Sequence, residues 1–152
     1  MDYRTLGKTG LRVSALGFGC GNVGGLIIRG EAKDRVRAVA RAMEAGVNYF
    51  DTAPSYGDGQ SERNLGQVLK ELRADVYVGT KVQIPSAEMG DLRGAIIRSV
   101  DASLARLGRD AVDLIQLHNH IAHQRTGAER ALSAQDVLGT VVETFRSLQA
   151  QG

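Results

Sequence analysis

Short apolar runs alternate with helical patterns along the chain at a nearly constant interval. Four such runs, each suited to a buried strand, start near residues 15, 47, 75 and 112. An interval of roughly 30 to 35 residues is the length of a βαβ unit. The runs lack strict polar–apolar alternation, which is typical of strands that are covered on both faces of a parallel sheet. The sequence therefore predicts an α/β fold of four βα units.

Helical periodicity and capping residues locate the helices between these strands. Gly46 and Gly108 stand where a left-handed residue commonly ends a helix. Asp91 and Ser133 are expected N-caps, and Asp136, three residues after Ser133, makes a variant of the capping box. The predicted helices cover residues 33–45, 61–72, 91–107 and 133–149, and the predicted strands cover residues 15–19, 47–50, 75–82 and 112–117.

The chain begins with a predicted β-hairpin, because residues 3–6 and 11–14 flank the turn sequence G-K-T-G. We expect one domain over residues 1–152, with residues 1–14 as the hairpin and residues 15–152 as the four βα units. Residues 20–32, which include L-I-I-R-G-E, are expected to form a loop before the first long helix.

Composition narrows the range of functions. The net charge is +2, from 19 basic and 17 acidic residues that are spread along the chain, so no basic block indicates nucleic-acid or membrane binding. The single cysteine, Cys20, excludes an internal disulfide framework and is read as a small packing residue. The amino terminus lacks a signal-peptide pattern, and no apolar run is long enough to span a membrane. We therefore expect a soluble cytoplasmic protein.

Four chemically capable residues follow the ends of three predicted strands. They are Asp51 and Tyr56 in N-Y-F-D-T-A-P-S-Y-G, Lys81 in Y-V-G-T-K-V, and His118 in D-L-I-Q-L-H-N-H. Since the carboxyl ends of parallel strands lie on one side of a sheet, we expect the four side chains to meet. Taken singly, Asp51 could cap a turn, Tyr56 could pack in a loop, Lys81 could be solvated and His118 could be a core histidine. Together they suit proton transfer to a substrate oxygen.

The order of the four motifs resembles the aldo-keto reductases. The resemblance rests on Y-R-T-L-G-K-T-G-L-R-V-S-A-L-G-F-G, on G-V-N-Y-F-D-T-A-P-S-Y-G with S-E-R-N-L-G behind it, on G-T-K-V and on D-L-I-Q-L-H. It covers essentially the whole chain, aligned with the first half of that family. It implies a (β/α)8 barrel of the TIM type that is plugged by an amino-terminal hairpin. The implied activity is reversible hydride transfer between NADP(H), or sometimes NAD(H), and a small carbonyl or alcohol.

The resemblance also implies a role for each residue. Tyr56 would protonate the substrate oxygen, Lys81 would favour ionisation of the phenol, and Asp51 would hold Lys81 in its charged form. His118 would orient the substrate oxygen and take part in the proton transfer. The loop with Gly19, Cys20 and Gly21 would lie near the nicotinamide ribose, with Asp51 as a second cofactor contact.

Two other motifs compete with this interpretation. Residues 19–24 match G-x-G-x-x-G, but a dinucleotide-binding loop should open directly into a helix, and the helical pattern starts only near residue 33. His118, His120 and His123 form H-x-H-x-x-H, a pattern found in barrel metal sites. Such sites need further histidines on later strands, and the chain has three in all. We therefore predict no metal site.

Length separates this chain from a whole barrel, which typically needs about 250 residues. In the family, residues that grip the nicotinamide amide and the adenosine phosphate come mainly from the second half. The chain is then a fragment, a half that pairs with a second copy, or a half-barrel with a role of its own. An idle half-barrel that serves as an interaction or regulatory module is therefore the alternative function. Free edge strands predict self-association, and we expect exposed apolar residues on the inward face of the sheet.

Overall fold

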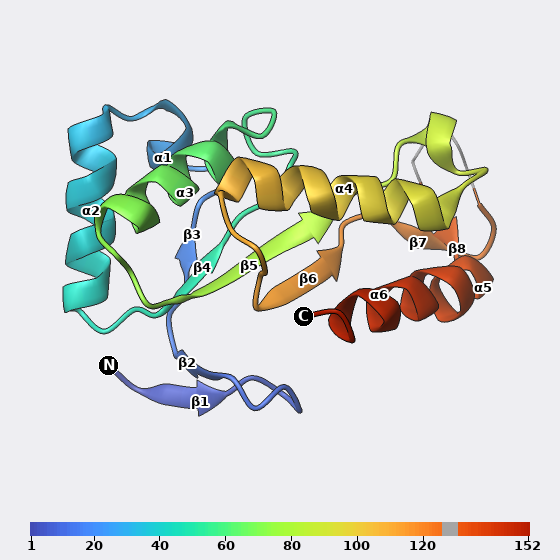
Figure 1. Ribbon diagram of the computed structural model, residues 1–152, viewed down its shortest axis with the longest axis horizontal. Helices are drawn as coiled ribbons and strands as arrows, with labels where there is room; N and C mark the ends of the chain where they lie inside the picture. Colours follow the sequence, from blue (N-terminus) through green and yellow to red (C-terminus); the bar gives the residue numbers. More distant parts are fainter. Residues whose placement is uncertain (126–130) are drawn as a thin grey trace.

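The predicted parallel sheet forms the centre of the molecule. The computed structural model describes residues 1–125 and 131–152. Four parallel strands lie in the order β3 (Phe18–Gly19), β4 (Tyr49–Asp51), β5 (Tyr77–Val82) and β6 (Leu114–Leu117) (Figure 1). The predicted α/β architecture with four parallel strands is confirmed.

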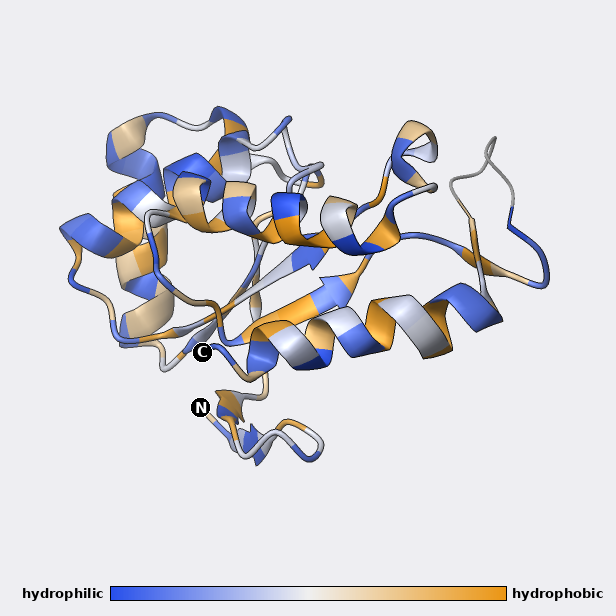
Figure 2. Ribbon diagram, turned by 45° about the vertical axis from the view of Figure 1, so that its right-hand side comes forward, coloured by the Kyte–Doolittle hydropathy of each residue, from blue (hydrophilic) through white to orange (hydrophobic). Residues whose placement is uncertain are grey.

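Helices cover one face of this sheet, and hydrophobic residues gather where helices and strands meet (Figure 2). One core joins α2 and α3 to β4 and β5 around Phe50, Leu65 and Val78. A second core joins α4 and α6 to β5 and β6 around Val82 and Ile96. The helical segments are α1 (Leu26–Arg29), α2 (Ala32–Glu44), α3 (Gln60–Glu71), η1 (Ser86–Glu88), α4 (Leu92–Leu107), α5 (Ala134–Asp136), η2 (Val137–Val141) and α6 (Val142–Gln149).

The expected hairpin is present as β1 (Tyr3–Thr5) and β2 (Arg12–Ser14), and it lies near the amino ends of the sheet strands (Figure 1). Asn48, just before β4, fastens it there. The Ser14 amide donates to Asn48 Oδ1 at 2.6 Å, and Asn48 Nδ2 donates to the Arg12 carbonyl at 3.0 Å. The Tyr3 hydroxyl adds a bond to the Gly46 carbonyl at 2.9 Å. The hairpin is therefore tied to the end of the sheet opposite the strand ends that carry the predicted site.

Most predicted caps are confirmed. Gly46 has φ +90° after α2, and Gly108 has φ +62° at the end of α4. The Asp91 side chain accepts a hydrogen bond from the Gly94 amide at 3.0 Å. Ser133 and Asp136 form a reciprocal capping box at the start of α5.

Several local predictions are wrong. Residues 26–29 form α1 rather than loop, and the first strand is only two residues long. The last helix is not continuous, because Gly139 has non-helical torsions (φ −93°, ψ −106°) inside the π-helical segment η2. A second, two-stranded parallel sheet, β7 (Ile121–Ala122) with β8 (Leu132–Ser133), stands where we expected only a loop. Residues 126–130 of that loop lie outside the described part.

Alternation along the strands divides the residues between the two faces of the sheet. Phe50 and Val78 are in register and face the helices, so Asp51, Lys81 and Gln116 point to the opposite, inward face. The Tyr49 side chain crosses this face, because a Cβ atom added at Gly17 would lie 3.0 Å from its ring and one added at Gly79 would lie 2.4 Å from its hydroxyl. The expectation of exposed apolar side chains on this face is met only in part, because Tyr49, Tyr77 and Leu114 lie on it and are half-buried. The large exposed hydrophobic residues lie outside these strands, at Met1, Tyr3, Leu16, Val23, Leu26, Ile121 and Leu138.

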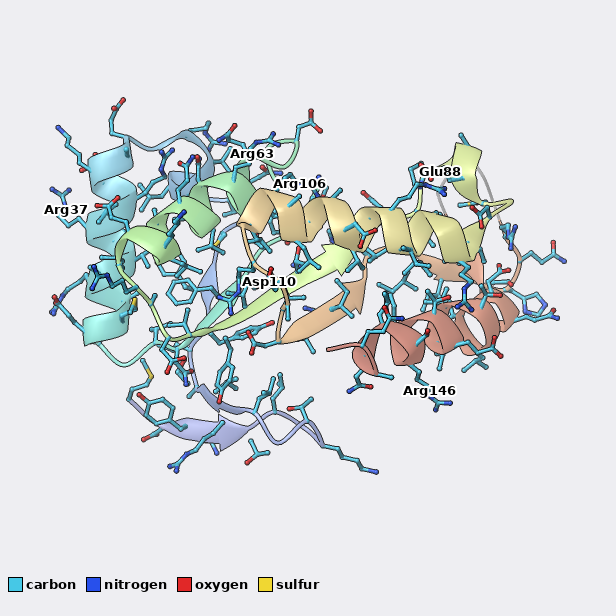
Figure 3. All side chains as sticks on the ribbon, viewed as in Figure 1. Arg37, Arg63, Glu88, Arg106, Asp110 and Arg146 are labelled. Atoms are coloured by element: carbon cyan, nitrogen blue, oxygen red, sulfur yellow. The ribbon has the colours of Figure 1, made fainter. Side chains whose placement is uncertain are left out.

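A buried carboxylate joins the helical layer to β5. Glu62 of α3 is fully buried and accepts from Thr80 Oγ1 at 2.6 Å and from Arg106 Nε at 2.5 Å. Arg106 lies near the end of α4 that adjoins α3 (Figure 3). Since Thr80 precedes Lys81, this network also fixes the strand that carries the site lysine.

Arg106→Met should destabilise the fold by about 3 kcal/mol, because removing one partner leaves the Glu62 charge buried without compensation. Urea unfolding followed by circular dichroism measures this change. Arg98→Met is the matched control, since Arg98 on the same helix pairs with the exposed Glu88 and Asp91 and should leave the midpoint nearly unchanged. Equal effects of the two substitutions would contradict the role of Glu62.

Candidate active site

The Lys81 ammonium group lies at the centre of the site. Its Nζ atom donates to Asp51 Oδ1 at 2.6 Å, to the Thr52 carbonyl at 2.9 Å and to the Tyr56 hydroxyl at 3.2 Å. A lysine ammonium has three donors and no acceptor, so these bonds use its full capacity. Lys81 is only 8% exposed, and the ion pair with Asp51 compensates its buried charge.

Tyr56 reaches this lysine from the turn between β4 and α3. The Tyr56 amide donates to the Ala53 carbonyl at 3.1 Å, which closes the turn after the strand. The start of α3 is fixed by Ser61, whose hydroxyl donates to the Cys20 carbonyl at 2.9 Å and contacts Thr52 Oγ1 at 2.8 Å. These bonds hold the turn that presents the phenol.

His118 completes the predicted set from the end of β6. Its amide donates to the Val82 carbonyl at 2.7 Å, and its ring meets the Tyr56 ring edge-on, with 6.2 Å between centroids. Within the described part of the chain, His118 Nδ1 is buried without a hydrogen-bond partner. The next residue, Asn119, bonds the backbone of Ile84 through both its side-chain oxygen, at 2.7 Å, and its nitrogen, at 2.9 Å. The loops after β5 and β6 are therefore locked together beside the imidazole.

Burial, followed by the positive charge of Lys81, lowers the pKa of His118 below its ordinary value of 6.5. The imidazole is therefore neutral at pH 7. A neutral imidazole keeps one donor and one acceptor nitrogen, so it can hydrogen-bond a substrate oxygen without adding a charge.

Two residues of the site were missed in the sequence. Gln116 Nε2 donates to Asp51 Oδ2 at 3.3 Å, on the carboxylate oxygen that Lys81 does not use. Tyr49 lies close enough to Asp51 that burial and the carboxylate charge raise its pKa to about 12. Of the two phenols Tyr49 and Tyr56, it is Tyr56 that accepts a hydrogen bond from Lys81. The signal for Gln116 was its position two residues before His118, which places both on one face of a strand.

The glycine-rich loop lies beside the four residues. Gly19 is in register with Asp51, and the Cys20 amide donates to the Asp51 carbonyl at 2.9 Å. A Cβ atom added at Gly21 would lie 3.5 Å from the Tyr56 ring. A Cβ atom added at Gly19 would have no neighbouring atom within 4 Å. Cys20 packs in the core with its pKa raised to about 12, chiefly by burial and then by the Asp51 charge, so it is a neutral thiol.

The structure does not favour either of the two competing motifs, the G-x-G-x-x-G run and the histidine cluster. The G-x-G-x-x-G run does lead into a helix, contrary to the sequence argument, but α1 is only four residues long. The described residues contain no group of three or more His, Cys, Asp or Glu side chains placed to hold a metal ion. No helix in the described ranges is long and apolar enough to cross a membrane.

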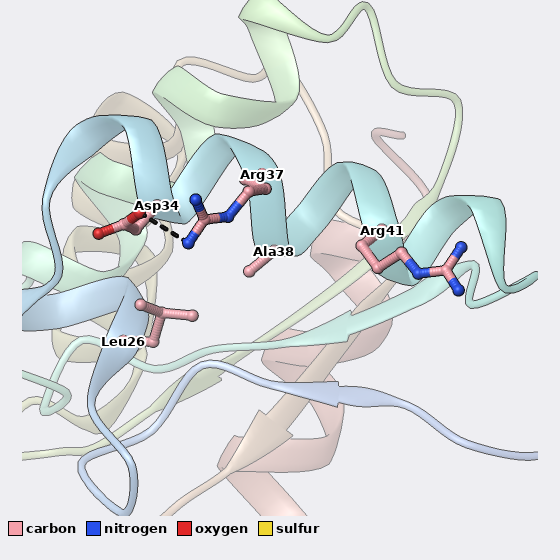
Figure 4. A pocket seen from close by; sticks show the side chains of 5 residues that line it. All are labelled: Leu26, Asp34, Arg37, Ala38 and Arg41. Carbon is pink, nitrogen blue, oxygen red and sulfur yellow. Dashed lines mark ion pairs between the residues drawn. The ribbon is translucent and has the colours of Figure 1, made fainter.

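A separate cavity of about 510 Å³ lies between α1 and α2 (Figure 4). Leu26, Asp34, Arg37, Ala38 and Arg41 line it, and Arg37 is paired with Asp34 at 3.0 Å. Since none of the four candidate site residues lines it, this cavity is distinct from the candidate active site.

Comparison with known proteins shows the family. Residues 15–151 match the sequence model of the Aldo/keto reductase family. The chain belongs to this family. It is 38% identical over 122 residues to L-galactose dehydrogenase of Arabidopsis thaliana, covering 78% of this chain and 38% of that protein.

Solved structures of reductases align with the whole chain. The holo form of the aldo-keto reductase AKR11C1 from Bacillus halodurans aligns with a TM-score of 0.76 and 31% identity, over 100% of this chain and 47% of that one. An aldo-keto reductase from Klebsiella pneumoniae in complex with NADPH aligns with a TM-score of 0.71 and 25% identity, over 100% of this chain and 47% of that one. The chain thus spans less than half the length of each relative.

Lys81→Met should raise the pKa of His118, because the substitution removes a positive charge that disfavours the imidazolium form. Proton NMR titration of the imidazole measures this shift, with His118→Gln used to assign the resonance. In the unchanged protein the midpoint should lie below 6.5. A midpoint that stays the same in Lys81→Met would contradict the placement of the ammonium beside the ring.

Proposed function

We propose that this polypeptide carries the proton-transfer half of an NADP(H)-dependent aldo-keto reductase site, with NAD(H) as the alternative cofactor. The substrate would be a small carbonyl compound or alcohol. The observation that carries this proposal is the hydrogen bond from Lys81 Nζ to the Tyr56 hydroxyl at 3.2 Å. The Lys81 charge, held against the phenol oxygen, can stabilise the negative charge that remains there when Tyr56 gives its proton to a substrate.

The four residues divide the work of carbonyl reduction. When a hydride reaches the carbonyl carbon, negative charge develops on the oxygen. Tyr56 donates its proton to that oxygen, and Lys81 stabilises the phenolate that remains. Asp51 pairs with Lys81 and holds its ammonium group in place. The neutral His118 orients the carbonyl oxygen beside Tyr56.

The residues at the strand ends fit the nicotinamide end of the cofactor, which would supply the hydride. Ligands of parallel barrels bind where the strands end. Gly19 offers open space next to Asp51 at that edge, and Gly21 lies against the Tyr56 ring. The backbone of residues 19–21 and the Asp51 carboxylate are therefore the contacts that we assign to the nicotinamide ribose.

We further propose that the chain self-associates through its sheet edges. Among the described residues, β3 and β6 each have one neighbouring strand in the four-stranded sheet. Leu16, beside β3, is 66% exposed, and Leu138, in the segment before α6, is 77% exposed. A groove of about 630 Å³ adjoins β6 between α4 and α6. Pairing of β6 with β3 of a second copy would cover these features and bring eight strands together.

Saturable NADPH binding by an associated form of the 152-residue chain is the expected result of a fluorescence titration, with the mass measured at the same concentration by sedimentation. Tyr56→Phe should bind equally well, because the substitution removes a proton donor and leaves the loop intact. A folded monomer that binds no NADPH would contradict both proposals. That outcome would favour an interaction or regulatory module.

A further inference from the structure

The two oxygens of the Asp51 carboxylate are held by different strands. Lys81 Nζ of β5 donates a hydrogen bond to Asp51 Oδ1 at 2.6 Å, and Gln116 Nε2 of β6 donates one to Asp51 Oδ2 at 3.3 Å. Gln116 is in register with Lys81, so both side chains leave the same face of the sheet at the same level. The carboxylate is thus fixed at both of its oxygens rather than at one.

Gln116 reaches Asp51 across an intervening strand. The residue of β5 in register with Asp51 is Gly79, which has no side chain. A Cβ atom there would lie 2.4 Å from the Tyr49 hydroxyl, so the position has no room for a larger residue. At this level β5 contributes no side chain, and the end of the Tyr49 side chain lies over Gly79.

We propose that Gln116 is a positioning residue that fixes the Asp51 carboxylate, so that one Lys81 proton stays directed at Tyr56. The bond from Lys81 to Tyr56, at 3.2 Å, is the longest of the three that the ammonium makes. A carboxylate without Gln116 can turn and offer both oxygens to Lys81. The ammonium is then drawn toward Asp51, and its contact with the phenol is lost.

The side chain at position 116 must be a neutral donor for this task. A hydrocarbon side chain would leave Asp51 Oδ2 without its protein donor. A second carboxylate would repel Asp51 and compete with it for Lys81. The amide satisfies the oxygen and leaves the charge balance of the Asp51–Lys81 pair unchanged. The catalytic role of this contact rests on the proposed function. The contact itself and its effect on Lys81 are independent of that function.

The Lys81 ammonium signal in ¹⁵N NMR tests the proposal without cofactor or turnover. Of the four lysines in the sequence, only Lys81 is buried, and its three protons are all bonded. The unchanged protein should therefore show one slowly exchanging ammonium signal, absent in Lys81→Met. Gln116→Met should speed its exchange with water by about tenfold or more, since one lost hydrogen bond of about 1.4 kcal/mol corresponds to a factor of ten.

Two further variants make the result decisive. Gln116→Asn keeps the amide but is one methylene too short to reach Asp51, so it should speed exchange as Gln116→Met does. Gln67→Met makes the same chemical change on an exposed part of α3 and should leave the signal unaltered. Circular dichroism confirms that each variant is folded. Slow exchange retained in either folded Gln116 variant would overturn the proposal. Failure of NADPH binding with these exchange rates as expected would overturn the proposed function alone.

Discussion

The buried ammonium of Lys81 is the constraint on which the site depends. A charge that is 8% exposed must be compensated, and its three partners lie on or just after β4. Asp51 ends that strand, the Thr52 carbonyl follows it, and Tyr56 closes the turn before α3. Any shift of β5 against β4 would break these bonds together. The network of Glu62, Thr80 and Arg106 on the other face of β5 opposes such a shift.

Much of this arrangement could be predicted from the sequence. The spacing of apolar runs predicted the four parallel strands, and glycine and acidic caps placed the ends of α2 and α4 to within two residues. The meeting of Asp51, Tyr56 and Lys81 followed from one geometric rule, that parallel strands end on the same side of a sheet. Such predictions succeed because they depend on local periodicity and on topology alone.

The features that were missed depend on contacts between distant residues. Gln116 contacts Asp51, 65 residues away in sequence, across β5, where Gly79 contributes no side chain. The break at Gly139 interrupts a sequence pattern that predicts one continuous helix, and its non-helical torsions have no signal in that pattern. The inward face holds the charged residues of the site together with glycines and the half-buried Tyr49, Tyr77 and Leu114, a mixture that the apolar runs alone did not predict.

Deuteride transfer is the measurement that tests the central claim most directly. The protein is incubated with a small aldehyde and NADPH that carries deuterium at the transferred position, and the alcohol is analysed by mass spectrometry. The account predicts deuterium on the former carbonyl carbon, formed at a rate that falls by about 10² to 10⁴ in Tyr56→Phe, because that variant lacks the proton donor. No deuterium transfer by the folded chain, or an equal rate in Tyr56→Phe, would contradict it.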